Sequence, residues 1–309
     1  MSKDNTSQKS ATQKGERIAK VLARAGVASR REVERMINEG RVSIDGKVLD
    51  TPATLVTSTK GITVDGHEVG EKDYTRVWRL YKTPDCVTTS HDPGGRKTIY
   101  DLLPEDMPRV ITVGRLDLTT EGLILLTNDG ELARWMELPK TGWKRTYRVR
   151  VYGRVKESDL ESLKKGVTVE GVKYGPIEAS VERSQGSNAW LRVSIREGKN
   201  REIRRVMEHL GLRVNRLIRI SYGPYELGSM EEGEGVEVPA TAIATYLPKE
   251  MRGSFNLPPK MDNAEKAKLG HATAKPKKPY KGSGGPRPSG KPKPKPKTGP
   301  GAKPRGRRS

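Results

Sequence analysis

The chain has 309 residues and a formal net charge of +21, of which +15 lies in residues 251–309. Its single cysteine, Cys86, excludes an internal disulfide and a cysteine-based zinc cluster, and no apolar run approaches the roughly 20 residues of a membrane-spanning helix. We therefore expect a cytoplasmic, metal-free protein of one medium-sized domain with smaller attachments, whose partner is a polyanion such as a nucleic acid. The alternative for the charge is a tail that only aids solubility.

The first segments predict a small unit of two helices followed by short strands at residues 16–69, after a polar, disordered arm at 1–15. Apolar residues at helical spacing between 18 and 25 predict the first helix, and Ser29 with Glu32 forms a capping box for the second. Alternating apolar residues at 42–44 and 62–64 each precede an Asp-Gly pair, which is typical of hairpins.

Basic side chains crowd the second helix and first hairpin of this unit. They are Arg30, Arg31, Arg35, Arg41 and Lys47. Such a group is suited to gripping RNA phosphates in a fixed register, although an ordinary solvated helix face explains the pattern equally well.

The segment from Glu16 to Leu49 resembles the alpha-L RNA-binding module, which occurs in a small-subunit ribosomal protein and in several RNA-modifying enzymes. The resemblance covers about fifty residues and includes AGVASRR and the GRV-x-x-(D/N)G element. It implies that the five basic residues bind RNA.

Beyond a polar linker at 70–76, residues 77–250 alternate strand-like and helix-like segments and predict the main domain. Residues 251–309 hold 11 of the chain's 21 prolines and repeats such as KPKPKPK. That composition cannot bury enough apolar surface to fold, so we expect a disordered basic tail with weak RNA contacts at most.

The main domain contains GRLDLTTEGLILLTNDG at residues 114–130. The apolar run Leu123–Leu126 predicts a buried strand, and Asp117 precedes it in a polar loop. On the residues alone, Asp117 is either a turn aspartate bonded to nearby backbone or a carboxylate that acts as nucleophile or base.

This segment resembles the signature of the pseudouridine synthase family that includes small-subunit synthase A and large-subunit synthases B, E and F. Segments 81–104, 143–153 and 196–211 fit the family in order. Two elements depart: lysine-proline-x-glycine is here KTPD at 82–85, and lysine-x-tyrosine is RTY at 145–147. The resemblance implies an α+β fold with a mixed, mainly antiparallel sheet and flanking helices.

The resemblance also assigns roles. Asp117 is the catalytic carboxylate, Tyr147 stacks on the uracil, and Arg204 pairs with Asp117 and keeps it ionised. Leu116 and Ile203 belong to the pocket. Arg115 contacts the RNA where the target nucleotide is flipped out, and Arg96 is a further RNA contact. From periodicity alone, Tyr147 is a core aromatic and Arg204 part of a solvated face.

The implied reaction is isomerisation of uridine to pseudouridine in ribosomal RNA, which needs no cofactor because no atoms or electrons are gained or lost. The long basic tail, similar to that of synthase B, favours the large subunit, and we expect a monomer. Whether the carboxylate attacks the sugar, adds to the ring or removes a sugar proton is open at this level. The alternatives are a small-subunit synthase and a non-catalytic RNA-binding or ribosome-assembly factor.

Overall fold

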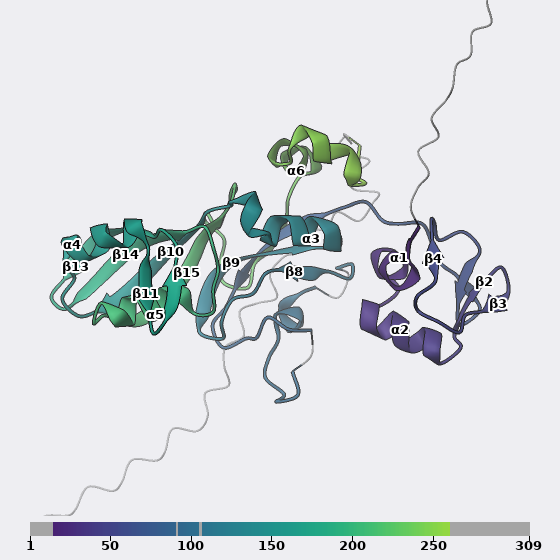
Figure 1. Cartoon of the computed structure of the whole chain (residues 1–309), viewed down its shortest axis with the longest axis horizontal. Helices are drawn as coiled ribbons and strands as arrows, with labels where there is room; N and C mark the ends of the chain where they lie inside the picture. The colour runs from purple at the N-terminus through teal and green to yellow at the C-terminus, as the bar shows by residue number, and fades with distance from the viewer. Residues whose placement is uncertain (1–14, 91, 105–106, 260–309) are drawn as a thin grey trace, which may run out of the picture. The chain divides into compact units, whose positions relative to one another are not determined.

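The computed structural model describes residues 15–90, 92–104 and 107–259. Its N-terminal unit contains helices α1 (Ile18–Arg24) and α2 (Arg30–Asn38) and small sheets (Figure 1). The strands are β1 (Glu16–Arg17), β2 (Val42–Ile44), β3 (Lys47–Val48), β4 (Leu55–Val56), β5 (Ile62–Val64) and β6 (His67–Glu68). β2 and β5 pair at the centre of a four-stranded sheet, and β1 pairs with β4.

The predicted local signals form this unit. Ser29 caps α2, because its hydroxyl accepts a hydrogen bond from the backbone N–H of Glu32 at 3.1 Å. Asp45 and Asp65 adopt positive φ before Gly46 and Gly66, as the predicted hairpin turns require. The apolar faces of α1, α2, β2 and β5 form one core.

The main domain is built on a nine-stranded sheet in the order β13-β14-β10-β15-β9-β7-β17, with β8 also pairing β9 and β16 pairing β15. Its strands are β7 (Val77–Lys82), β8 (Ile111–Val113), β9 (Thr120–Thr127), β10 (Arg145–Tyr152), β13 (Glu178–Gln185), β14 (Asn188–Ile195), β15 (Arg213–Tyr222), β16 (Tyr225–Glu226) and β17 (Gly235–Glu237). Among these pairings only β9–β15 is parallel. The predicted mixed, mainly antiparallel sheet is confirmed.

Helices cover both faces of this sheet. They are α3 (Gly130–Glu137), α4 (Glu157–Ser162), α5 (Glu202–His209) and α6 (Ala240–Tyr246). The hairpin β11 (Val167–Val169) with β12 (Val172–Tyr174) and the 3-10 turns Ile99–Leu102, Pro139–Thr141, Leu163–Lys165 and Lys249–Ser254 complete the domain. α4 and α5 belong to one apolar core, whereas α3 and α6 belong to the other.

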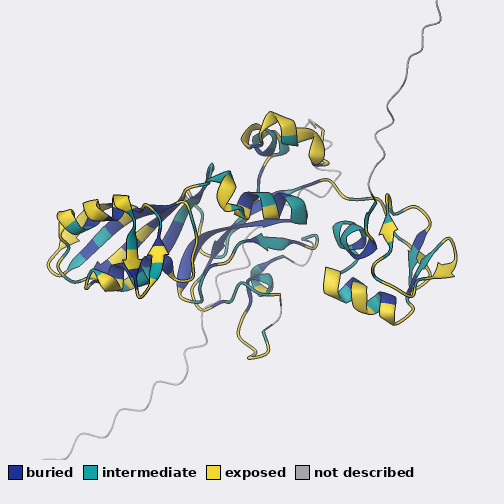
Figure 2. Cartoon of the chain, in the orientation of Figure 1, coloured by how far each residue is buried: buried dark blue, intermediate teal, exposed yellow. Residues whose placement is uncertain are grey.

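Strand β9 shows why the sheet is stable. All eight of its residues are buried, as the central dark blue strands of Figure 2 illustrate. Ile124 and Leu126 face the core that holds α4 and α5, and Leu123 and Leu125 face the core that holds α3 and α6. Because successive side chains point to opposite faces, a strand covered on both sides reads as a continuous apolar run.

The segment before β7 is more firmly held than a free linker. Thr75 is fully buried, and its hydroxyl donates to the Asp129 carboxylate at 2.9 Å. The side chain of Asn128 accepts the backbone N–H of Arg76, and Asp129 also caps α3. The NDG end of the motif at 114–130 therefore anchors the start of the main domain.

The C-terminal prediction needs one correction. The sequence predicts disorder from residue 251, but Lys249–Ser254 forms a 3-10 helix and Phe255 is buried in the core. The backbone N–H of Thr75 donates to the carbonyl oxygen of Asn256 at 2.6 Å, which fixes this segment. Residues 260–309 of the predicted tail and residues 1–14 of the arm predicted at 1–15 lie outside the described residues.

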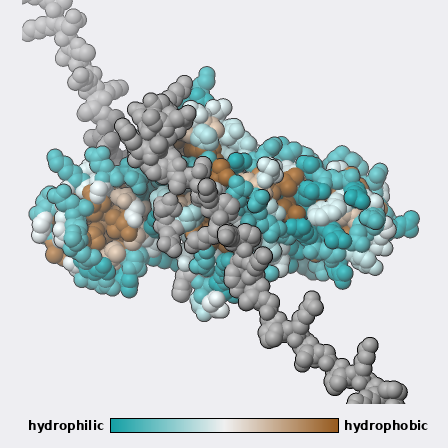
Figure 3. All heavy atoms as spheres, turned by 180° about the vertical axis from the view of Figure 1, so that it is seen from behind, coloured by the Kyte–Doolittle hydropathy of each residue, from teal (hydrophilic) through white to brown (hydrophobic). Residues whose placement is uncertain are grey.

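None of the helices that the described residues form combines the length and apolar character needed to span a bilayer. On the face shown in Figure 3, hydrophilic residues cover most of the coloured surface and apolar residues occupy limited patches.

Candidate active site

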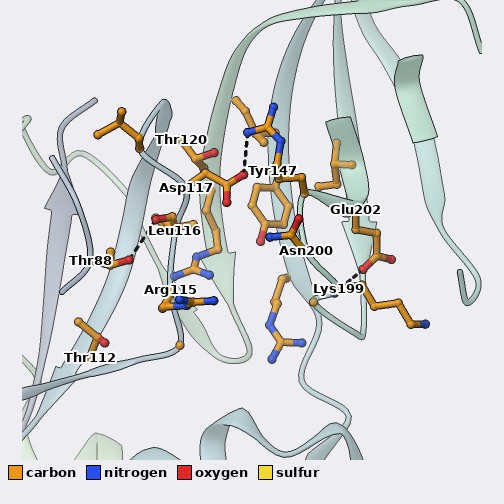
Figure 4. Close-up of a pocket in the computed structure, with 18 of the residues that line it drawn as sticks. Thr88, Thr112, Arg115, Leu116, Asp117, Thr120, Tyr147, Lys199, Asn200 and Glu202 are labelled. Atoms are coloured by element: carbon orange, nitrogen blue, oxygen red, sulfur yellow. Dashed lines mark hydrogen bonds and ion pairs between the residues drawn. The ribbon is translucent and has the colours of Figure 1, made fainter. Parts of the chain in front are cut away.

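A cavity of about 760 Å³ opens over the central strands of the main sheet, where the loop before β9 meets β10, β15 and the start of α5. It contains predicted site residues from four separate segments: Arg96, Arg115, Leu116, Asp117, Tyr147 and Ile203. Figure 4 shows Asp117 and the Tyr147 ring projecting into this space from neighbouring elements. The fold thus brings together residues that are far apart in the sequence.

The backbone around Asp117 is held from several sides. The Thr88 hydroxyl donates to the carbonyl oxygen of Leu116 at 3.1 Å, and the N–H of Thr120 donates to that of Asp117 at 3.0 Å. Arg204 Nη2 donates to the carbonyl oxygen of Thr119, two residues beyond Asp117, at 3.2 Å. These bonds fix the loop, while the Asp117 side chain keeps 32% of its surface exposed.

Lys82 provides the deepest anchor of the same loop. Its side chain is fully buried at the end of β7, and Nζ donates to the carbonyl oxygens of Thr83, Leu118 and Thr120 at 3.0, 3.1 and 2.8 Å. Burial lowers the pKa of the Lys82 ammonium, although nearby acids including Asp117 act in the opposite direction. The lysine therefore ties the loop to β7 without reaching the cavity surface.

The KTPD departure from the family pattern is accommodated locally. Asp85 stands where the family pattern has glycine, and it adopts φ +59°, a left-handed conformation that aspartate tolerates better than most residues. Its N–H donates to the carbonyl oxygen of Leu118 at 3.0 Å. The substitution therefore keeps the turn that touches the Asp117 loop.

The predicted partner of Asp117 requires a correction. Arg201 Nη1 lies 3.6 Å from Asp117 Oδ2, whereas Arg204 is bonded to the carbonyl oxygens of Thr119 and Val214 and forms no ion pair with Asp117. Periodicity places both arginines on one helical face. In the structure α5 begins only at Glu202, and Arg201 adopts a left-handed φ of +50°, which takes it off that face.

Tyr147 lies in β10, where it shares one face with buried Val149 and Val151, as the sequence predicts. It is 7% exposed and belongs to the apolar core while it also lines the cavity. Leu116 and Ile203 are buried and line the same cavity. A flat ring with apolar neighbours and an adjacent carboxylate is suited to holding a planar base beside a reactive group.

Comparisons with known proteins decide the family. A family model described as RNA pseudouridylate synthase matches residues 59–209, and one described as S4 domain matches residues 16–62. An RNA pseudouridine synthase of Rickettsia felis, described as uncharacterized, is 44% identical over 225 residues, covering 72% of this chain and 96% of the relative. The chain belongs to the RNA pseudouridine synthase family. The predicted family and enzyme class are confirmed, as is the small N-terminal RNA-binding domain.

Further pseudouridine synthases are similar to this chain and support the same family. The ribosomal large subunit pseudouridine synthase B of Pasteurella multocida is 43% identical over 236 residues, covering 74% of this chain and 68% of that protein. The protein of the same name from Salmonella typhimurium is 42% identical over 252 residues, covering 79% and 84%. A crystal structure titled pseudouridylate synthase matches with a TM-score of 0.53 at 25% identity and covers 75% of this chain and 99% of that chain.

Predicted RNA contacts at the mouth of the synthase cavity are Arg115 and Arg96. Arg115 is exposed and lines the cavity (Figure 4). Arg96 is also exposed, but its guanidinium makes two hydrogen bonds to the Asp92 carboxylate, at 3.0 and 2.7 Å. An RNA phosphate would have to compete with Asp92 for Arg96.

The N-terminal basic residues differ in availability. Arg35 pairs with Glu32, and Arg41 makes a bidentate pair with Asp65 at 2.7 and 2.6 Å. Arg30, Arg31 and Lys47 are exposed and form no ion pair with the described residues. Of the five predicted residues, these three remain open to a phosphate.

Sequence reasoning missed three buried charged residues at this site, two that line the synthase cavity and one, Lys82, that lies behind it. They are Lys82, Glu202 and Arg219. Glu202 is 3% exposed at the start of α5, and burial, with the nearby negative charge of Glu197, raises its pKa to about 7. Hydrophobic periodicity assigns charged residues to solvent, so only a position inside a known motif could have singled them out.

Proposed function

We propose that this RNA pseudouridine synthase isomerises uridine in ribosomal RNA, with Asp117 as its catalytic carboxylate. The observation that carries the assignment is the pairing of a part-exposed carboxylate, on a loop anchored by Lys82, with the ring of Tyr147 in one cavity. The names of relatives from Pasteurella multocida and Salmonella typhimurium support the large ribosomal subunit as the source of the substrate.

The chemistry requires a group beside the bond between the base and its sugar. In the isomerisation the N1–C1′ bond breaks, the base turns, and a C5–C1′ bond forms. The proton at C5 is lost and N1 gains one, so the composition of the nucleotide does not change. Asp117 supplies the carboxylate at C1′ or its neighbour, and the flat Tyr147 ring supports the base while it turns.

Arg201 and Arg204, the two arginines near Asp117, have different proposed roles. Arg201, with 48% of its side chain exposed, provides a positive charge 3.6 Å from the carboxylate. Arg204 is a positioning residue, because its guanidinium holds the backbone at Thr119, two residues beyond Asp117. This assignment replaces the direct contact that the sequence predicts for Arg204.

The target nucleotide in structured RNA must leave its stack to reach this cavity, at a cost of a few kcal/mol. Arg115, exposed at the mouth, contacts the RNA there. In the N-terminal unit, RNA phosphates are bound by Arg30, Arg31 and Lys47. These contacts add affinity for RNA but do not determine which base is selected.

The test maps pseudouridines in ribosomal RNA from cells with the gene, without it, and with an Asp117→Asn replacement. We expect loss of one or more large-subunit pseudouridines in the last two strains, and retained RNA affinity in the purified variant. A changed site in the small subunit would reassign the substrate. An unchanged map, or full activity of Asp117→Asn, would overturn the proposal.

A further inference from the structure

Arg219 is a buried cation whose hydrogen-bonding capacity is only partly used. It is 2% exposed in β15 and lines the same cavity as Asp117 and Tyr147. Its Nε donates to the carbonyl oxygen of Leu123 at 2.7 Å, but Nη2 is buried without a hydrogen-bond partner. Arg219 also forms no ion pair with a carboxylate of the described residues.

The neighbouring Arg145, unlike Arg219, has hydrogen-bond acceptors within the chain for both of its terminal nitrogens. Arg145 lies 4.8 Å and Arg219 5.0 Å from the centre of the Tyr222 ring. Arg145 in addition donates to the Tyr222 hydroxyl at 3.0 Å and to the carbonyl oxygens of Arg196 and Glu197. Burying a donor without an acceptor is unfavourable, and more so when the donor is charged. The unpartnered side of Arg219 therefore favours an acceptor from outside the chain.

The position of Arg219 restricts what that acceptor is. Arg219 is the cross-strand neighbour of Tyr147, so both side chains lie on one face of the sheet. A base stacked on Tyr147 therefore presents one edge toward Arg219. The more exposed cations of the cavity, among them Arg115 and Arg201, are the ones accessible to phosphates at its mouth.

We propose that Arg219 donates a hydrogen bond to a carbonyl oxygen of the target uracil, O2 or O4, and so holds the base against Tyr147. The inference rests on the proposed function, because it assumes a uridine in this cavity. It makes Arg219 a substrate-contacting residue that reads the base, distinct from the cations that hold the backbone. Hydrogen bonds from charged donors are strong enough for a contact of this kind to affect turnover.

The first arm of the test compares Arg219→Met, Arg219→Lys and Arg148→Gln on a ribosomal RNA transcript. Arg148 is exposed on β10 and paired with Glu182, so its replacement removes one positive charge outside the cavity. We expect kcat/KM to fall about tenfold or more in Arg219→Met, less in Arg219→Lys, and less than about twofold in Arg148→Gln. Full kcat/KM in a folded Arg219→Met would overturn the proposal.

The second arm changes the substrate and leaves the protein fold untouched. Transcripts carry 2-thiouridine, 4-thiouridine or a phosphorothioate at the target nucleotide. If Arg219 contacts a carbonyl oxygen, one thiouridine lowers kcat/KM with wild-type protein and has little further effect in Arg219→Met, which lacks the donor. The proposal would be overturned if the Arg219 substitution changed the effect of the phosphorothioate instead, or of none of the three modified transcripts.

A binding measurement separates failure of this contact from failure of the proposed function. Free uridine and inorganic phosphate are titrated into wild-type protein and Arg219→Lys and followed by NMR. We expect uridine affinity to fall about fivefold or more, with phosphate affinity unchanged. Unchanged uridine affinity would overturn the contact whether or not ribosomal RNA is isomerised, whereas absence of isomerisation would count against the function alone.

Discussion

The Lys82 ammonium lies 2.8 Å from the carbonyl oxygen of Thr120, the first residue of the strand that follows the Asp117 loop. Together with the bond to Leu118, it joins the end of β7 to both sides of Thr119. The loop that carries Asp117, the proposed catalytic residue, is therefore fixed by a charge that does not line the cavity.

Replacing this lysine tests that role. Lys82→Met fills similar volume but leaves three carbonyl oxygens without their donor, so we expect unfolding free energy to fall by about 1–3 kcal/mol. The loosened Asp117 loop lowers kcat about tenfold or more, while KM and RNA affinity change little. Urea unfolding measures the stability and steady-state kinetics measure kcat and KM. The matched control is Arg79→Met on the same strand, where the guanidinium is half-buried and donates to the Glu226 carbonyl oxygen, away from the Asp117 loop. Normal kcat in Lys82→Met would contradict the anchoring role.

The two arginines near Asp117 are separable by mutation. The exposed Arg201–Asp117 pair is worth little, because solvent screens it, so Arg201→Gln should lower kcat by no more than about fivefold and leave the melting temperature unchanged. Arg204→Gln removes the hydrogen bonds to the Thr119 and Val214 carbonyl oxygens, and should lower both kcat, about tenfold or more, and stability. The reverse order of kcat values would restore Arg204 as the direct partner of Asp117.

Local sequence motifs predicted several of the cavity residues but not the conformation of Arg201. The resemblance placed Asp117, Tyr147, Leu116 and Ile203 correctly in one cavity, because each lies inside a local motif. The left-handed backbone at Arg201 has no signal in hydrophobic periodicity, since that pattern assumes a helix that begins earlier.

The parallel pairing of β9 with β15 could not be predicted from the sequence either. Pairing of distant strands depends on the whole sheet, and the parallel register Gly122 to Arg219 follows from no local pattern. Short strands, turns and caps were predictable because a few adjacent residues determine them, as at Ser29 and at the Asp-Gly hairpins.

Gly122 offers a direct test of this pairing between β9 and β15. It has φ +95°, and an added Cβ would lie 2.4 Å from the carbonyl oxygen of Arg219, so Gly122→Ala should cost about 3 kcal/mol or more. Gly171→Ala is the control, because Gly171 has φ +78° with nothing within 4 Å of the added Cβ, and should cost only about 1 kcal/mol. Equal losses in urea unfolding would show that backbone strain, not contact with β15, sets the requirement.

Glu202 predicts a pH dependence of stability. Burial, together with Glu197, raises its pKa to about 7 from an ordinary 4.5, although the backbone N–H of Lys199 partly opposes the shift. The folded state therefore binds a proton that the unfolded state has lost, and stability falls as pH rises from about 4.5 to about 7.

Glu202→Gln keeps the size of the side chain and has no proton to lose, so it should lack this part of the pH slope. The contribution is at most about 3 kcal/mol between pH 4.5 and 8, measured as the difference in unfolding free energy by urea at those values. Glu208→Gln, on the exposed side of α5, is the matched control and should keep the wild-type slope. If Glu202→Gln and wild type lose the same stability over this range, Glu202 is ionised in the folded protein, and its buried carboxylate must then have a partner beyond the Lys199 N–H.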